Sequence, residues 1–197
     1  IVIDDFVIRD EDTYDEDLFS IEISSIEDNY ALSFDGQDDE VKIDGAGFIS
    51  GDDPRTISVW AAGQGGNIVS LGDGNTANKR FSILVDGSGY VRIIGESNDW
   101  GTDYYLPSDV MTYLVVTYDG SGTVSLFVNG EFFSEAQMDY NTEGDAPVMI
   151  GTNTDNRNDE YFQGIIDDVS IWRVALSASD IQELYGNHSS IWNISND

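Results

Sequence analysis

The sequence has no cysteine, a single histidine and few basic residues. Without thiols the chain can form neither disulfides nor thiolate metal sites, and one histidine makes a transition-metal site improbable. Only 8 lysines and arginines stand against 38 acidic residues, which gives a net charge of -30. Nucleic acid and anionic membrane surfaces are therefore poor partners, because both need basic residues at the contact. No apolar run is long enough to cross a membrane.

What remains is enough to build a folded domain. Of the 197 residues, 40% are hydrophobic and 12% aromatic, which is enough to fill a core and argues against wholesale disorder. The length suits one β domain, or one domain plus a fragment. Self-repulsion at this net charge destabilises a compact state, so we expect bound calcium or a salty medium to offset it.

Short alternating segments separated by turn residues dominate the chain and predict an all-β sandwich. The expected strands are 30–34, 40–43, 56–61, 67–71, 80–86, 90–95, 111–119, 123–129, 131–136, 147–151 and 162–172. Asn129-Gly130 is a two-residue hairpin signal, because a type I′ turn needs positive φ at both positions. The tetrapeptide DGSG occurs at 86–89 and again at 119–122, each time between two expected strands.

The two ends of the chain differ from this pattern. Residues 1–29 are strongly acidic and contain an alternating stretch at 19–23, so we expect the end of a neighbouring adhesin-type repeat or a linker. Near the other end, Ser177 followed by Asp180 predicts a capping box and one short helix. We expect a polar tail at 187–197, and the abrupt start suggests a segment of a longer protein.

Five segments occur in a recognisable order: ALSFDGQDDEVKI, TISVWA, MTYLVVTYDGSGTVSLFVNGE, PVMIG and FQGIIDDVSIWRVALSASDIQELY. Together they resemble the laminin-G-like, or concanavalin A-like, jelly-roll domains over residues 30–186. The resemblance implies two stacked antiparallel sheets with the first strand close to the last. It also implies a non-catalytic, monomeric module of a secreted or bacterial surface protein, which binds carbohydrate or mediates adhesion beside other domains of the same chain.

The family often carries one structural calcium ion near the junction of its first and last strands. The matching positions here are Asp35, Gly36, Asp38, Asp39 and Asp167. Simple alternation places Asp167 on the same face as Val169 and Ile171, which we expect to be the core face. The plainer interpretation is that Asp35 caps a turn and Asp167 accepts backbone hydrogen bonds.

Three Asx-rich loops are candidates for binding a polar ligand, since sugars are held by carboxylates and amides with an aromatic ring against one face. Their candidate ligand residues are Asp73, Asn75, Asp99, Trp100, Asp103, Asn153, Asp155, Asn156 and Asp159. Trp100 is expected to lie in an exposed loop and stack on a sugar ring. In the alternative, Trp100 packs onto the sandwich and the loops are merely solvated.

Catalysis has little support in the sequence. The only histidine, His188, follows the expected helix, and the E-x-D-x-x-E strand signature of glycosidases with this fold is absent. The leading hypothesis is an extracellular, calcium-stabilised module that binds carbohydrate for cell-surface adhesion. The alternatives are an ancillary domain of a secreted polysaccharide-degrading enzyme and a structural spacer.

Overall fold

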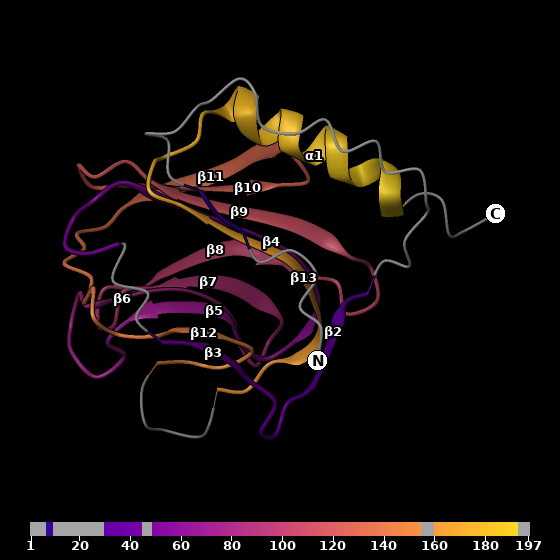
Figure 1. Cartoon of the computed structure of the whole chain (residues 1–197), viewed down its shortest axis with the longest axis horizontal. Helices are drawn as coiled ribbons and strands as arrows, with labels where there is room; N and C mark the ends of the chain where they lie inside the picture. The colour runs from indigo at the N-terminus through magenta and orange to yellow at the C-terminus, as the bar shows by residue number, and fades with distance from the viewer. Residues whose placement is uncertain (1–6, 10–29, 45–48, 155–159, 193–197) are drawn as a thin grey trace.

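The computed structural model describes residues 7–9, 30–44, 49–154 and 160–192. Two antiparallel sheets face each other, and one helix lies across the outside of the larger sheet (Figure 1). This arrangement confirms the predicted two-sheet jelly roll with a C-terminal helix. The alternating stretch expected at 19–23 lies outside the described residues.

The larger sheet has seven strands, in the order β1-β13-β4-β9-β10-β11, with β2 also paired to β13. Its members are β1 (Val7–Arg9), β2 (Leu32–Asp35), β4 (Arg55–Gln64), β9 (Thr112–Tyr118), β10 (Thr123–Val128), β11 (Glu131–Gln137) and β13 (Gln163–Trp172). β2 pairs with the first half of β13, so the first block of the resemblance does lie beside the last. β1 pairs in parallel with the second half of β13, which joins residues 7–9 to the sandwich.

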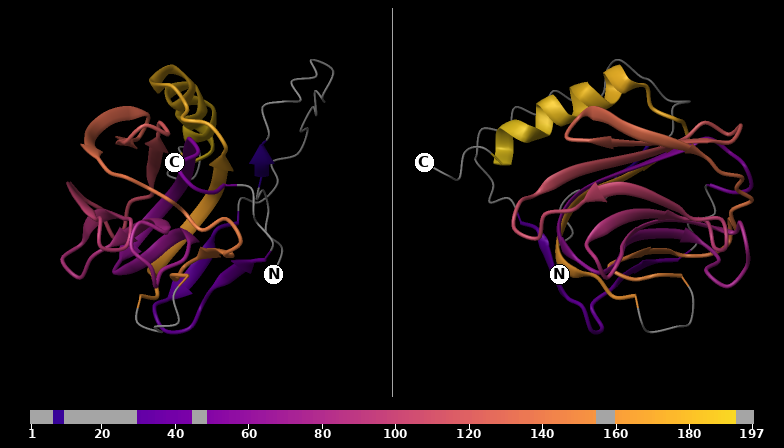
Figure 2. Two further views of the ribbon diagram at one scale, coloured as in Figure 1. Left: turned by 90° about the vertical axis from the view of Figure 1, so that its left-hand side faces the viewer. Right: turned by 180° about the vertical axis from the view of Figure 1, so that it is seen from behind.

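The smaller sheet has six strands in the order β3-β12-β5-β6-β7-β8. They are β3 (Val41–Ile43), β12 (Val148–Ile150), β5 (Gly66–Gly72), β6 (Arg80–Val85), β7 (Tyr90–Ile94) and β8 (Trp100–Tyr105). β8 is a strand that the sequence pattern missed. The view from behind in Figure 2 shows the two sheets as separate layers, with the helix beyond the larger one.

The main core fills the space between the sheets. Alternate residues of β4 and β9, such as Ile57, Val59 and Leu114, point inward and meet Phe81 and Ile83 of β6. All five side chains are fully buried. This packing is the period-2 pattern that the sequence predicted.

The helix α1 (Ala178–Trp192) begins at the predicted capping box. The Asp180 backbone N–H donates to Ser177 Oγ at 3.2 Å, and the Ser177 N–H donates to the Asp180 carboxylate at 2.9 Å. Ile181 is fully buried against Trp60 and Tyr113 on the outer face of the larger sheet. The helix continues to Trp192, so His188 lies within it and not in a polar tail.

The predicted turns also hold. Asn129 and Gly130 both have positive φ, at 50° and 81°, as the hairpin between β10 and β11 requires. In each DGSG turn, the Asp side chain accepts two backbone hydrogen bonds. One comes from the N–H two positions later and the other from the N–H four positions later. Asp119, which makes the second of these turns, has a pKa lowered to about 2, because burial raises it less than the hydrogen bonds from Ser121 and Thr123 lower it.

Candidate functional site

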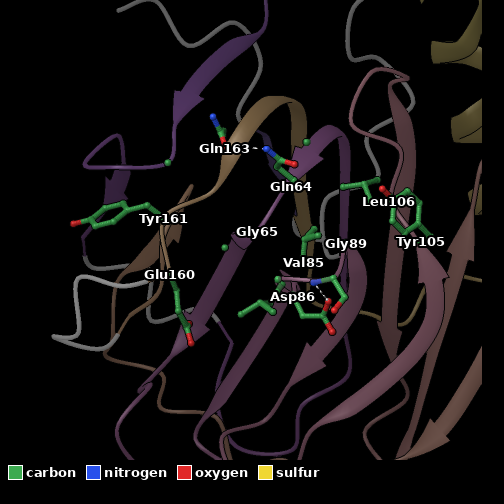
Figure 3. A pocket seen from close by; sticks show the side chains of 16 residues that line it. Gln64, Gly65, Val85, Asp86, Gly89, Tyr105, Leu106, Glu160, Tyr161 and Gln163 are labelled. Carbon is green, nitrogen blue, oxygen red and sulfur yellow. Dashed lines mark hydrogen bonds between the residues drawn. The ribbon is translucent and has the colours of Figure 1, made fainter.

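A cleft of about 700 Å³ opens at one end of the sandwich, where turns from both sheets converge (Figure 3). Five separate segments line it: the end of β2, the β4–β5 turn, the β6–β7 turn, the end of β8 and the start of β13. The lining residues are Gly36, Gly63, Gln64, Gly65, Gly66, Leu84, Val85, Asp86, Gly87, Ser88, Gly89, Tyr105, Leu106, Glu160, Tyr161 and Gln163. Tyr161 and Glu160 lie on one side of the cleft, and Tyr105 and Leu106 lie on the other.

A pair of amides forms part of the rim. Gln64 and Gln163 are directly opposite one another in the β4–β13 ladder, and Gln64 Nε2 donates to the side-chain oxygen Oε1 of Gln163 at 3.1 Å. Both side chains are exposed. Each amide therefore keeps donor and acceptor capacity for a polar ligand.

Glycine keeps one part of the rim low. Gly65 has a positive φ of 63°, and no atom lies within 4 Å of the position that a Cβ would take. A residue with a side chain rarely adopts this φ and would extend into the open space. With glycine here, the backbone itself can approach a ligand closely.

Glu160 connects the cleft to a buried polar network beneath it. One carboxylate oxygen, Oε2, accepts from Asn67 Nδ2 at 2.5 Å, from Asn153 Nδ2 at 2.8 Å and from the Arg80 guanidinium at 2.8 Å. Burial alone raises the pKa of Glu160, but these hydrogen bonds and the Arg80 charge lower it by more, so the net shift is downward. Glu160 is therefore an ionised structural acceptor at neutral pH.

Asp86 also has its carboxylate engaged. Its Oδ1 accepts the backbone N–H groups of Ser88 at 2.8 Å and Tyr90 at 3.1 Å, which fixes the β6–β7 turn. The turn places Gly89 against the ring of Tyr105, which is 54% exposed. Tyr105 in turn packs edge-on against Tyr90 at 5.7 Å between ring centroids.

An acidic turn lies beside the cleft, just after β2. Single carboxylate oxygens of Asp35, Asp38 and Asp39 all come within 4.8 Å of one another, and all three residues are exposed. The Asp35 N–H donates to Asp39 Oδ2 at 2.9 Å, and Asp35 Oδ1 accepts the Gln37 N–H at 2.8 Å. Gly36, within this turn, belongs to the cleft lining. Three carboxylates on one short turn supply the hard oxygen atoms that calcium prefers as ligands.

Residues 35–182 match the profile of a laminin G family described as the concanavalin A-like lectin/glucanases superfamily. The chain belongs to this superfamily. A search of curated proteins finds no match.

Solved structures with this superfamily's fold are similar to the chain at low sequence identity. Domain 4 of AbnA, a GH43 extracellular arabinanase from Geobacillus stearothermophilus in complex with arabinotriose, is 20% identical with a TM-score of 0.60, over 79% of this chain and 76% of that one. The CBM40 of the Ruminococcus gnavus IT-sialidase, bound to alpha2,3 sialyllactose, is 16% identical with a TM-score of 0.59, covering 79% and 96%. A SAP-like pentraxin from Limulus polyphemus is 14% identical with a TM-score of 0.57, covering 78% and 80%. At these identities the likeness establishes the fold.

The predicted calcium ligand Asp167 lies apart from the acidic turn. In the β13 ladder Asp35 is opposite Gln163, four residues before Asp167, which corresponds to about 13 Å along the strand. The face assignment was also wrong. Asp167 is opposite Trp60, which packs under the helix, whereas Val169 belongs to the main core.

A β-bulge explains why Asp167 faces the helix side of the sheet. The β13–β4 register shifts between Asp167 and Ser170, and Asp168 has a positive φ of 46°. One extra residue reverses the alternation, so Asp167 and Val169 face opposite sides of the sheet. Asp167 is buried, and its Oδ1 accepts the backbone N–H of Asp168 at 2.9 Å, in line with the plainer interpretation.

Two of the predicted ligand loops use their polar side chains to hold the loops themselves. The Asp73 carboxylate accepts from the Asn75 backbone at 2.8 Å and from Thr76 Oγ1 at 2.7 Å, and these bonds lower its pKa. Asp99 accepts the Gly95 N–H at 3.1 Å. Neither Asp73, Asn75 nor Asp99 lines the cleft.

Trp100 and Asp103 lie on strand β8 and not in a loop. Trp100 is half-buried and packs against the main core, while Asp103 is exposed. The expected exposed platform is therefore absent at Trp100. Asn153 is 4% exposed within the Glu160 network, and Asp155, Asn156 and Asp159 lie outside the described residues.

Sequence reasoning missed most of the cleft: Gln64, Asp86, Tyr105, Tyr161 and Gln163. A partial signal was present in GQGGN at 63–67, where three glycines interrupt two strands, and in the first DGSG turn. Both are glycine-rich turns, which often let a ligand approach the backbone.

Proposed function

We propose that this chain is an extracellular, non-catalytic carbohydrate-binding module whose ligand occupies the cleft. The observation that carries the proposal is the composition of its walls. Exposed amides at Gln64 and Gln163 can exchange hydrogen bonds with sugar hydroxyls. Tyr105 and Tyr161 on opposite sides offer aromatic faces to the apolar face of a sugar ring.

The structural neighbours support this proposal. The arabinanase domain and the sialidase CBM40 have the same fold and were solved with arabinotriose and with sialyllactose. Both are modules of larger carbohydrate-active proteins, so an ancillary role in a secreted enzyme fits the present chain as well as surface adhesion does. Among the described residues, no helix meets the length and hydropathy needed to cross a membrane.

The state of the carboxylates in the cleft favours binding over hydrolysis. A glycosidase needs a carboxylic acid of raised pKa opposite a second free carboxylate. Here the pKa of Glu160 is lowered, and one of its oxygens already accepts three hydrogen bonds. Asp86 holds the backbone of its own turn. Both carboxylates therefore already have structural partners.

Calcium is part of the proposal, with a smaller ligand set than the sequence suggested. Asp35, Asp38 and Asp39 fit a hard cation, because their carboxylates converge and are exposed, so that backbone carbonyls and water can complete the shell. Asp167 does not fit the same ion, because it is displaced along β13 and lies on the helix side. An ion on the acidic turn would hold Gly36 and Gln163 at the rim of the cleft.

The test is a glycan array probed in millimolar calcium, followed by calorimetry with the glycans that bind. Gln163→Ala removes one amide of the rim and should weaken binding at least tenfold, the size of a modest hot spot. Gln137→Ala is the matched control, since Gln137 is an exposed amide on β11 away from the cleft. If the wild-type protein binds no glycan, the spacer hypothesis is the better one.

A further inference from the structure

Arg92, on the outer face of the smaller sheet, forms no hydrogen bond or ion pair with the residues that the structure describes. It lies in the middle of β7, opposite Leu84 of β6 and Gly101 of β8. Its side chain is half-buried, and its Nε is buried with no hydrogen-bond partner. A buried guanidinium donor left unsatisfied costs about 1–3 kcal/mol or more, so such a group calls for an explanation.

The other cations on the sandwich strands and their turns are engaged. Lys42 pairs with Asp44 at 3.0 Å, Lys79 with Glu143 at 3.5 Å, and Arg80 with Glu160 at 2.8 Å. Arg55 donates to the carbonyl oxygens of Asp53 and Gly51. Among the lysines and arginines whose side chains lie in residues 30–44, 49–154 and 160–187, only Arg92 and the exposed Arg173 have neither an ion pair nor a side-chain hydrogen bond.

The surroundings of Arg92 are open and adjoin the cleft. No atom lies within 4 Å of the position that a Cβ would take on Gly101, directly opposite Arg92. Leu84, its neighbour on β6, belongs to the cleft lining. The Tyr90–Tyr105 pair lies two residues away along β7, about 7 Å on the same face.

We propose that Arg92 binds the carboxylate of an acidic sugar, so that the ligand is an oligosaccharide containing a uronic or sialic acid residue. This inference rests on the proposed carbohydrate-binding function. One sugar would occupy the cleft beside Tyr105, and the next would lie over the tyrosine pair with its carboxylate at the guanidinium. The planar fork of arginine matches a carboxylate with two parallel hydrogen bonds, which a neutral hydroxyl cannot reproduce.

The large negative charge of the protein opposes an anionic ligand only at long range. At about 0.15 M ionic strength the screening length is about 8 Å, so distant carboxylates contribute little at the site. The nearest exposed acid on the neighbouring strand is Asp103, and it forms no ion pair with Arg92. At such salt, the contact between the carboxylate and Arg92 decides the preference.

Calorimetry with matched pairs of probes tests the proposal. One pair is trigalacturonate and its methyl ester, which share a backbone and differ in charge, and the other is 3′-sialyllactose and lactose. For at least one pair we expect the acidic member to bind at least tenfold more tightly than the neutral one. Arg92→Gln should abolish that difference, and Arg92→Lys should retain part of it.

Arg173→Gln is the matched control, because it removes the same charge from an exposed residue just after the end of β13, whereas Gln163 at the cleft begins that strand. It should leave the preference unchanged. Equal binding of both members of each pair, or binding of neutral glycans alone, overturns the acidic preference while the binding function stands. Absence of binding to every glycan overturns both. If Arg173→Gln also loses the preference for the acidic glycan, that preference comes from net charge and not from Arg92.

Discussion

The outer faces of the two sheets are covered in opposite ways. On the larger sheet, Trp60, Tyr113, Val115 and Phe127 form an apolar cluster that the helix seals with Ile181. On the smaller sheet, the corresponding outward positions carry Arg80, Ser82 and Asn67, which are fully or almost fully buried but polar. The first face is closed by hydrophobic packing, and the second is closed by hydrogen bonds to the segment around Glu160.

The two faces therefore contribute differently, one chiefly to stability and the other to the placement of polar groups. A helix lying on apolar side chains buries a large area and gains stability from it. A polar layer under a loop gains less net free energy, but it fixes the position of every donor and acceptor and needs a full set of partners. Arg92 lies on this polar face and the cleft adjoins it through Leu84, so precisely placed polar groups can serve a ligand there.

The largest expected effect is on the apolar face. Trp60 is 3% exposed and lies 5.2 Å from Tyr113 and 5.8 Å from Tyr185 between ring centroids. Trp60→Ala should lower the free energy of unfolding by about 3–5 kcal/mol, because it deletes a large buried ring and leaves a cavity. Denaturant unfolding measures the change. Tyr90→Ala, a 44% exposed ring on the other sheet, is the control and should cost far less.

The second prediction sets the acidic turn against Asp167. A ligand at a hundredfold excess over its Kd stabilises the folded state by about 2.7 kcal/mol. Calcium should therefore raise the melting temperature more than sodium of equal ionic strength, and Asp38→Asn should abolish the difference. Asp167→Asn should retain it, because Asp167 faces the helix. If sodium is as effective as calcium, the effect is screening and the acidic turn holds no ion.

The third prediction concerns the polar layer. Glu160→Gln leaves the buried Arg80 without its 2.8 Å carboxylate partner and should cost about 1–3 kcal/mol at pH 7. Glu143→Gln, which breaks the more exposed 3.5 Å pair with Lys79, is the control and should cost at most about 1 kcal/mol. Urea unfolding of both variants measures the two costs.

The stability difference between the wild-type protein and Glu160→Gln should also depend on pH. The pKa of Glu160 is lowered in the folded state from its ordinary value of 4.5. Its stabilising contribution is therefore present above pH 4.5 and is lost as the pH falls through the folded pKa. Wild-type and Glu160→Gln proteins should differ most at neutral pH and converge once the pH has fallen below the folded-state pKa of Glu160. A difference that stays constant across this range would mean that the Glu160 charge does not matter.

The sandwich itself could be predicted from the sequence, because alternation and turn residues are local signals. Eleven expected strands correspond to β2 to β7 and β9 to β13. β8 was missed because its outward positions, Gly101, Asp103 and Tyr105, are exposed and two of them resemble a loop. The bulge at Asp168 was also invisible, since nothing in IDDV marks the extra residue that reverses the face of Asp167.

The candidate site was harder to predict, because it depends on contacts between distant segments. Glu160 meets Asn67 and Arg80 from 93 and 80 residues away, and Gln64 meets Gln163 from 99. The Asx-rich loops suggested Asp73 and Asp99 as ligand residues. Composition alone does not distinguish an Asp that hydrogen-bonds its own loop from one that binds a ligand. The acidic turn is different, because its members are close in sequence: the carboxylates of Asp35, Asp38 and Asp39 do converge, and their binding of calcium stays a prediction.

The last prediction compares two aromatic residues at opposite ends of β8. Tyr105 is 54% exposed at the cleft, whereas Trp100 is half-buried against the main core. Tyr105→Ala should weaken glycan binding about tenfold, equivalent to 1.4 kcal/mol, and should change the free energy of unfolding by less than about 0.5 kcal/mol. Trp100→Ala should do the reverse, with a clear loss of stability and little direct effect on binding by the variant that remains folded. For each variant, calorimetry measures glycan affinity and urea unfolding measures the free energy of unfolding. If Trp100→Ala abolishes binding and leaves stability unchanged, the ligand lies over the start of β8, and the cleft at Tyr105 is not the site.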